Sequence, residues 1–302
     1  MNWFWIAIIG YFLSGLVLVL DKFILTKSVG KPIVYAFYST IFMLAVFLAA
    51  PFGASLLHGL DWLWAVVSGF GFGFGLWFMF IAVKKGEASH INPFLGGIIT
   101  ILVFLLSNYF LQEKLVAIQV LGVIILTLAC LFLSSEKSQK HHGFHTGFLW
   151  AILAGLCFSA SHVSAKYIYD IYGFFTGLVW TKGAVGLVGL ILLLFPSVRH
   201  SLRNKNNQES KTSAKRHAML IVIADKVLGV GAVLLIQYAI AIGSVTVVNA
   251  LVGVQYTFMF LIIYLFTKFL PRVFKEYFTK RELMIETIAI ILVIIGSALF
   301  VL

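Results

Sequence analysis

Ten apolar segments, each close to twenty residues long, constrain the fold of this chain more than any other feature. An α-helix needs about 20 apolar residues to cross the hydrocarbon core of a bilayer. Only 11% of the 302 residues are charged, whereas a soluble domain carries about 25%. The sequence therefore predicts an all-α integral membrane protein in contact with a lipid bilayer. The segments lie near residues 3–21, 33–50, 62–83, 89–110, 116–134, 148–168, 174–195, 219–240, 245–267 and 284–302.

Two stretches of the chain resemble each other at an offset of 157 residues. Residues 82–100 and 239–257 share identical residues at five positions, among them Gly86/Gly243 and Asn92/Asn249. A second match relates Trp5, Gly10 and Ser14 to Trp150, Gly155 and Ser159. Five helices per half would place the two copies in opposite orientations, as in the inverted repeats of transporters. We therefore predict ten transmembrane helices in two five-helix halves, residues 1–135 and 147–302.

The distribution of basic residues predicts which loops face the cytoplasm. The odd-numbered loops hold 18 of the 22 Lys and Arg residues, and short cytoplasmic loops are rich in these residues. The odd loops are therefore expected in the cytoplasm, with both termini outside, in the plasma or inner membrane. The net charge of +11 is explained by these membrane-flanking residues, so no nucleic-acid partner is expected.

The third segment carries a ladder of alternating glycines, Gly69, Gly71, Gly73 and Gly75. Pairs four residues apart allow close approach of helix backbones. We expect them to pack within the bundle, with a dimer face as the alternative, so the protein is expected to be a monomer or homodimer. The polar stretch from Pro196 to His217 is expected to form a loop.

Several motifs together resemble the EamA-type transporters of the drug/metabolite transporter superfamily. They are the two inverted halves, the Ala-x-x-x-Gly turns into the helices that carry Asn92 and Asn249, and the run Gln112-Glu113-Lys114-Leu115. The run at 112–115 looks like the family's Gly-Glu turn into the last helix of a half. The second half departs from the pattern because it lacks this turn and has Lys280-Arg281-Glu282 instead. The resemblance covers the whole chain and implies ten helices around a central cavity. It also implies export or exchange of amino acids, metabolites or drugs.

Polar residues inside the apolar segments are the candidates for a substrate-binding or coupling site. A charge at the centre of a membrane helix costs about 2.5–3.5 kcal/mol on insertion scales, so such groups usually face a cavity or a partner. The nine candidates are Lys182, His162, Asp225, Lys226, Asn92, Asn249, Ser14, Ser159 and Gln255.

Each candidate also has a structural interpretation. Lys182 could form a structural ion pair or extend toward the membrane surface, and His162 could be a packing residue rather than a proton carrier. Asp225 could pair with a neighbouring lysine, and Lys226 could extend toward the basic loop before it. The two point about 100° apart on a helix, so they are not expected to pair well with each other. The two asparagines could serve only interhelical hydrogen bonding.

Signatures of enzymes and of resident cofactors are missing from the sequence. We find no Walker A sequence, no Asp-rich diphosphate motif and no HExxH or Cys/His metal spacing, so no catalytic residue, metal or cofactor is expected. His141, His142 and His145 lie in a polar loop and are expected to be solvated. The predicted function is a secondary transporter, exporter or exchanger, of a small polar metabolite such as an amino acid or organic anion. The alternatives are a membrane enzyme acting on lipids or isoprenoids, and a scaffold without transport activity.

Overall fold

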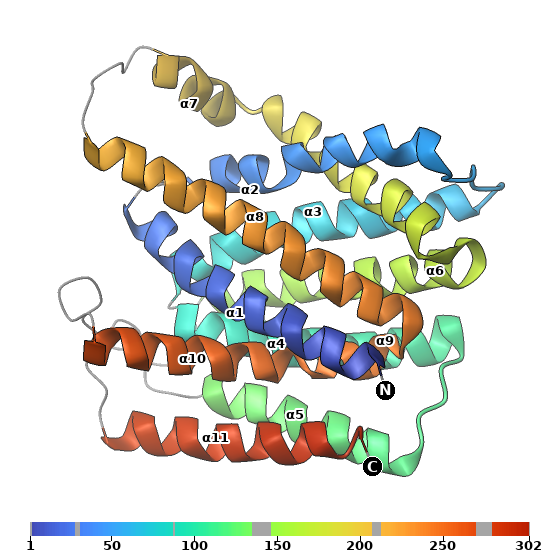
Figure 1. Cartoon of the computed structure of the whole chain (residues 1–302), viewed down its shortest axis with the longest axis vertical. Helices are drawn as coiled ribbons and strands as arrows, with labels where there is room; N and C mark the ends of the chain where they lie inside the picture. Colours follow the sequence, from blue (N-terminus) through green and yellow to red (C-terminus); the bar gives the residue numbers. More distant parts are fainter. Residues whose placement is uncertain are drawn as a thin grey trace.

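The computed structural model describes residues 2–27, 31–86, 88–134, 146–206, 213–269 and 280–301, which form helices lying side by side in one bundle (Figure 1). The histidine cluster at 141–145 and the loop positions 207–212 and 270–279 fall outside these residues. The helices are α1 Asn2–Lys27, α2 Pro32–Ile41, η1 Phe42–Phe52, α3 Asp61–Lys85, α4 Ala88–Leu106, η2 Ser107–Leu111, α5 Ala117–Ser134, α6 Thr146–Leu193, α7 Pro196–Asn206, α8 Ser213–Ile242, α9 Val245–Ala250, α10 Val252–Phe269 and α11 Lys280–Ala298.

Eight helical segments of the described chain are long and apolar enough to cross a membrane, and Leu283–Ala298 forms a shorter apolar helix. One of the eight is the whole of α6, whose 48 residues are interrupted at Gly173 by non-helical backbone with φ 76° and ψ 167°. Residues 146–172 and 174–193 flank this break. The protein is therefore an all-helical integral membrane protein, as the apolar segments predicted.

The stretch from Pro196 to His217 is not only a loop, contrary to expectation. Residues 196–206 form the amphipathic helix α7, in which Val198 is fully buried and Leu202 packs beside it. Proline is favoured in the first turn of a helix because its missing N–H has no intrahelical partner there. Val198 and Leu202, one helical turn apart, thus pack this polar segment against the bundle.

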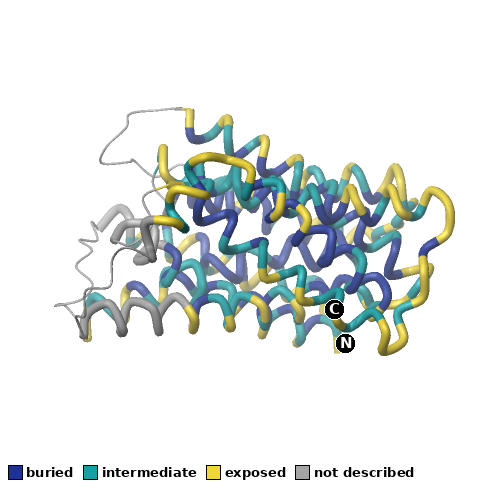
Figure 2. The backbone as a smooth tube through the Cα atoms, turned by 90° about the horizontal axis from the view of Figure 1, so that it is seen from above, coloured by how far each residue is buried: buried dark blue, intermediate teal, exposed yellow. Residues whose placement is uncertain are grey.

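The glycine ladder of α3 is packed against α6 inside the bundle. A Cβ atom added at Gly69 would lie 2.7 Å from the carbonyl carbon of Ala184, and one at Gly71 would lie 2.6 Å from the Cys157 oxygen. At Gly73 and Gly75 an added Cβ atom would meet the α6 side chains of Val188 and Phe158. Alternating glycines thus let α3 approach both arms of α6, and all four are used within one chain. Figure 2 shows the resulting band of buried residues along the middle of the bundle.

The 3₁₀ segment η1 continues α2 and packs on a second row of glycines in α6. An added Cβ atom would lie 2.5 Å from the backbone of Leu44 at Gly186 and 2.8 Å from the backbone of Ile41 at Gly189, and Gly183 faces Phe47. Side chains three residues apart are aligned on a 3₁₀ helix, so Ile41, Leu44 and Phe47 form one ridge. Glycines three residues apart on α6 receive that ridge. The other residues of η1 are left to face elsewhere, and several of them line the cavity described below.

Replacing Gly69 by alanine tests the close packing of α3 on α6. The new methyl group would overlap the backbone of α6, and overpacking of this kind costs about 1–3 kcal/mol. A lower melting temperature of the purified protein in detergent is expected. Gly231→Ala is the matched control because the nearest atom to its added Cβ is 4.0 Å away. Since alanine is favoured over glycine in a helix, this control should melt at the wild-type temperature or slightly above. Equal behaviour of the two variants would contradict the packing.

Candidate functional site

A cavity of about 510 Å³ lies between helices from both halves of the chain. Its wall is mainly apolar and aromatic, with residues from α1, α2, η1, α3, α4, α6, α8, α9 and α10. Ligand sites are typically cavities of roughly this kind, lined by apolar side chains and a few polar groups that orient the ligand. The polar side chains of this wall are Tyr11, Ser14, Asp21, Tyr38, Ser39, His162, Asp225, Lys226, Gln237, Asn249, Gln255 and Tyr256.

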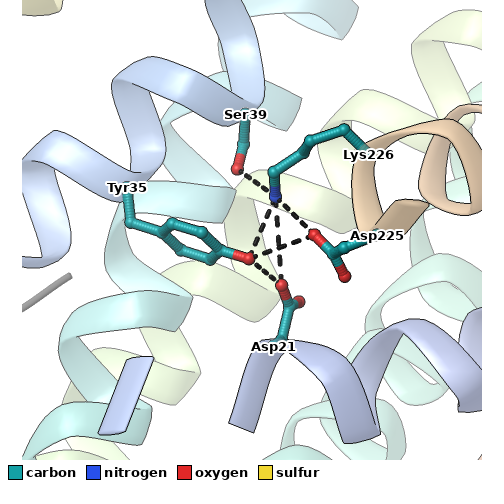
Figure 3. A network of polar contacts seen from close by, with 5 residues as sticks. All are labelled: Asp21, Tyr35, Ser39, Asp225 and Lys226. Carbon is teal, nitrogen blue, oxygen red and sulfur yellow. Dashed lines mark hydrogen bonds and ion pairs between the residues drawn. The ribbon is translucent and has the colours of Figure 1, made fainter. Parts of the chain in front are cut away.

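Four of these polar residues, together with Tyr35, form a hydrogen-bonded network around the ammonium group of Lys226 (Figure 3). Lys226 Nζ lies 3.0 Å from Asp225 Oδ2, donates to Tyr35 Oη at 3.0 Å and donates to Ser39 Oγ at 3.2 Å. The three hydrogens of the ammonium group are thus all used. The Tyr35 hydroxyl in turn donates to Asp21 Oδ1, which lies 3.9 Å from Lys226 Nζ. The network joins α1, α2 and α8.

The expectation that Asp225 and Lys226 do not pair was wrong. Their Cα–Cβ bonds do diverge around α8, but the four-carbon stem of Lys226 is long enough to fold its ammonium group back onto the neighbouring carboxylate. Asp225 is fully buried, and its Oδ1 atom has no hydrogen-bond partner in the described chain. The carboxylate therefore keeps one oxygen free beside the cavity.

A second polar pair lies on another part of the cavity wall. His162 Nδ1 is 2.6 Å from Asn249 Oδ1, and Asn249 Nδ2 donates to the Val245 carbonyl at 2.8 Å. Because the amide nitrogen is committed to that carbonyl, Asn249 presents its oxygen to the ring, and His162 Nδ1 must be the donor. In the neutral ring, Nε2 is then the acceptor. His162 and Asn249, two site candidates from separate apolar segments, thus form one hydrogen-bonded pair.

Lys182 is 2% exposed and lies behind the cavity wall rather than on it. Its ammonium group is 4.4 Å from the centroid of the Phe72 ring, which does line the cavity, and has no hydrogen-bond or ion-pair partner among the described residues. Neither the structural ion pair nor an extension to the membrane surface is therefore seen. A cation–π contact gives about 0.5–2 kcal/mol, less than the cost of placing a charge at this depth in a membrane.

The remaining predicted residues divide into two groups. Ser14 and Gln255 line the cavity together with His162, Asn249, Asp225 and Lys226. Asn92 and Ser159 do not belong to its wall. Ser159 is fully buried and donates to the Gly155 carbonyl at 2.7 Å, while the Oδ1 atom of buried Asn92 has no partner in the described chain. The two asparagines that match in sequence therefore have different surroundings.

Three residues of the network, Asp21, Tyr35 and Ser39, were not among the predicted site residues. Asp21 ends the first apolar segment and Tyr35 begins the second, where polar groups are usually assigned to the membrane surface. The sequence held one usable signal, an acidic residue within an apolar segment just before a basic loop. Nothing local indicates that this residue meets α8 more than 200 positions later.

Glu113 in the motif of the α4–α5 connection does more than face solvent. Its Oε2 atom accepts a hydrogen bond of 2.6 Å from Thr246 Oγ1, and Thr246 lies 2.6 Å from Ser107 Oγ. The chain leaves the π-helical turn η2 through Gln112, which has a left-handed φ of 51°. This arrangement ties the end of α4 to the first turn of α9, a few residues before Asn249.

Replacing Lys226 by methionine should destabilise the protein strongly. The change leaves two carboxylates in an apolar surrounding without their counter-charge, and breaking such a pair costs about 3–5 kcal/mol. Thermal unfolding in detergent measures the loss. Adding Asp225→Asn to the methionine variant removes one of the charges and should recover part of it. Lys268→Met, at an exposed lysine of α10, should melt like the wild type. A methionine variant at position 226 that melts like this control would contradict the network.

Comparison with known proteins agrees with the resemblance found in the sequence. No curated protein matches the chain. Among the solved structures 28 chains match, and one of these, titled only as the crystal structure of a protein, has a TM-score of 0.61 and 19% sequence identity. The likeness covers 97% of this chain and 95% of that one and shows that the two share a fold. Residues 1–135 match the model of the EamA-like transporter family. Over these residues the chain is therefore similar to the EamA-like transporters, a family of the drug/metabolite transporter superfamily.

Proposed function

We propose that the protein is a secondary active transporter that moves a small polar metabolite, such as an amino acid or organic anion, by alternating access. The observation that carries this proposal is the hydrogen-bonded network of Asp21, Asp225 and Lys226 on the wall of an otherwise apolar cavity within membrane helices. Ionisable residues inside a membrane usually mark substrate or ion pathways. The apolar remainder of the wall suits a ligand that is polar at one end only.

The charges of the network suggest how substrate binding is coupled to an ion. Two carboxylates surround one ammonium group, so the ionised cluster carries one surplus negative charge. A proton or a cationic group of the substrate would neutralise it, and Asp225 Oδ1 is the free atom that would receive either. The His162–Asn249 pair offers the ring atom Nε2 as a hydrogen-bonding group for the substrate.

We further propose that the helices form two inverted five-helix repeats, residues 1–135 and 147–302. Residues 146–172 would then correspond to α1, residues 174–193 to α2 with η1, α8 to α3, and α11 to α5. With α10 as the counterpart of α4, the helix contacts support this pairing. When each helix of a contacting pair is replaced by its counterpart in the other half, the result is again a contacting pair. The pair α1–α8 becomes the pair of α6 with α3, α1–α10 becomes α6–α4, and α4–α5 becomes α10–α11, while α5–α11 is its own counterpart.

Transport by the reconstituted protein is the direct test of this function. Amino acids and organic acids are first screened by thermal shift, since a ligand stabilises the fold by RT ln(1 + [L]/Kd). Uptake of the stabilising compounds into proteoliposomes should then be saturable. Asp225→Asn should lower it about tenfold, a loss of about 1.4 kcal/mol of interaction, whereas Lys268→Met should leave it unchanged. Wild-type vesicles that take up none of these compounds faster than empty vesicles would contradict the proposal.

The proposed orientation places the odd-numbered loops in the cytoplasm and the termini outside. Cysteines introduced at Ser210 and Thr279, which lie outside the described residues, should resist membrane-impermeant thiol reagents in intact cells. They should react once the membrane is opened. Rapid labelling of both positions in intact cells would show the opposite orientation.

A further inference from the structure

The ammonium group of Lys182 is the one polar group of the predicted site that the described chain leaves entirely to an aromatic ring. It is enclosed, it lies over Phe72, and none of the described carboxylates is bonded to it. The neighbouring Thr181, by contrast, satisfies its hydroxyl by donating to the Gly177 carbonyl at 2.7 Å. A lysine in such surroundings keeps its charge only at a high cost unless a counter-charge is bound beside it.

Two buried hydroxyl groups without partners belong to the same region of the α3–α6 interface. They are Ser68 Oγ and Ser161 Oγ, and both residues are essentially inaccessible to solvent. Ser68 lies one helical turn before Phe72, so the two side chains share a face of α3. Ser161 lies opposite Gly71, where an added Cβ would be 3.3 Å from Ser161 Cβ. The short stretch 68–72 of α3 thus adjoins all three unpartnered groups.

These three groups have the composition of an anion site. An ammonium group supplies three donor hydrogens and each hydroxyl supplies one, while no acceptor is provided for them by the described chain. We propose that Lys182, Ser68 and Ser161 form a buried binding site for a small monovalent anion such as chloride. A single-atom anion suits donors that come from close-packed helices, because it needs no particular orientation and little space.

The Phe72 ring separates this site from the central cavity. One of its neighbours is Lys182, and another is His162, whose ring centroid lies 6.4 Å away on the cavity wall. The anion would therefore be held apart from the substrate and would compensate the charge of Lys182 inside the bundle. The inference does not depend on transport and is tested without it.

Thermal unfolding at different chloride concentrations tests the proposal. Purified protein in an uncharged detergent is melted while sodium chloride replaces sodium gluconate at constant ionic strength, which keeps general screening the same. The melting temperature of the wild type should rise by several degrees and reach a plateau. Lys182→Met should abolish the chloride-dependent rise. Ser68→Ala and Ser161→Ala should each require several-fold more chloride for half of the effect, and they serve as the test should the lysine variant not fold.

Thr181→Val is the matched control, because it removes a buried hydroxyl next to Lys182 whose hydrogen bond is already made within α6. It is expected to melt lower but to keep the wild-type response to chloride. A wild type that melts at the same temperature in chloride and in gluconate would overturn the proposal. An unchanged chloride response of Lys182→Met, or of a variant with both Ser68→Ala and Ser161→Ala, would also overturn it, since the anion would then bind elsewhere.

Discussion

Charge balance in an apolar surrounding is the constraint on which the site depends. Lys226 satisfies all three of its hydrogens with Asp225, Tyr35 and Ser39, and Tyr35 passes the network on to Asp21. Taking ions out of water costs several kcal/mol each, which attraction repays only in well-bonded arrangements. Because the cluster joins α1, α2 and α8, any movement that separates these helices must supply another partner for the charges. A proton or substrate that does so would couple its own binding to the movement.

The helices around the cavity combine close packing with short segments of irregular backbone. Glycines along α3 and α6 bring backbones into contact, and this close packing holds the wall in place. The irregular segment η1 and the break between α9 and α10 adjoin the cavity. Irregular backbone at membrane depth is tolerated where it is buried in protein or lines a cavity. Close helix packing and short irregular segments thus occur together around the cavity of the described chain.

Local features of the sequence predicted apolar membrane helices and six of the polar residues that line the cavity. Segment length and apolar composition identify membrane helices without knowledge of their neighbours, and polar residues such as Asp225, Lys226, His162 and Asn249 stood out against that background. Pairings between distant residues could not be predicted this way. Asp21 lies at the end of an apolar segment, where a polar residue is ordinary. Its partners on α2 and α8 come close to it only through the packing of the helices. The sequence did not predict the amphipathic helix α7 for the same reason, since the buried Val198 and the partly buried Leu202 can be recognised only from the surface that they cover.

If the cavity opens alternately to the two sides of the membrane, Ser39 should be reachable from both of them. Ser39 lines the cavity beside Lys226, and cysteine is nearly the same size as serine. The variant Ser39→Cys is made in a background with Cys130 and Cys157 replaced by alanine and is inserted in oriented vesicles. The account predicts that a small impermeant thiol reagent modifies this cysteine from either face of the membrane, and more slowly when a stabilising ligand is bound. Modification from one face only, with and without ligand, would contradict it, because a pocket that opens to a single side cannot carry a solute across.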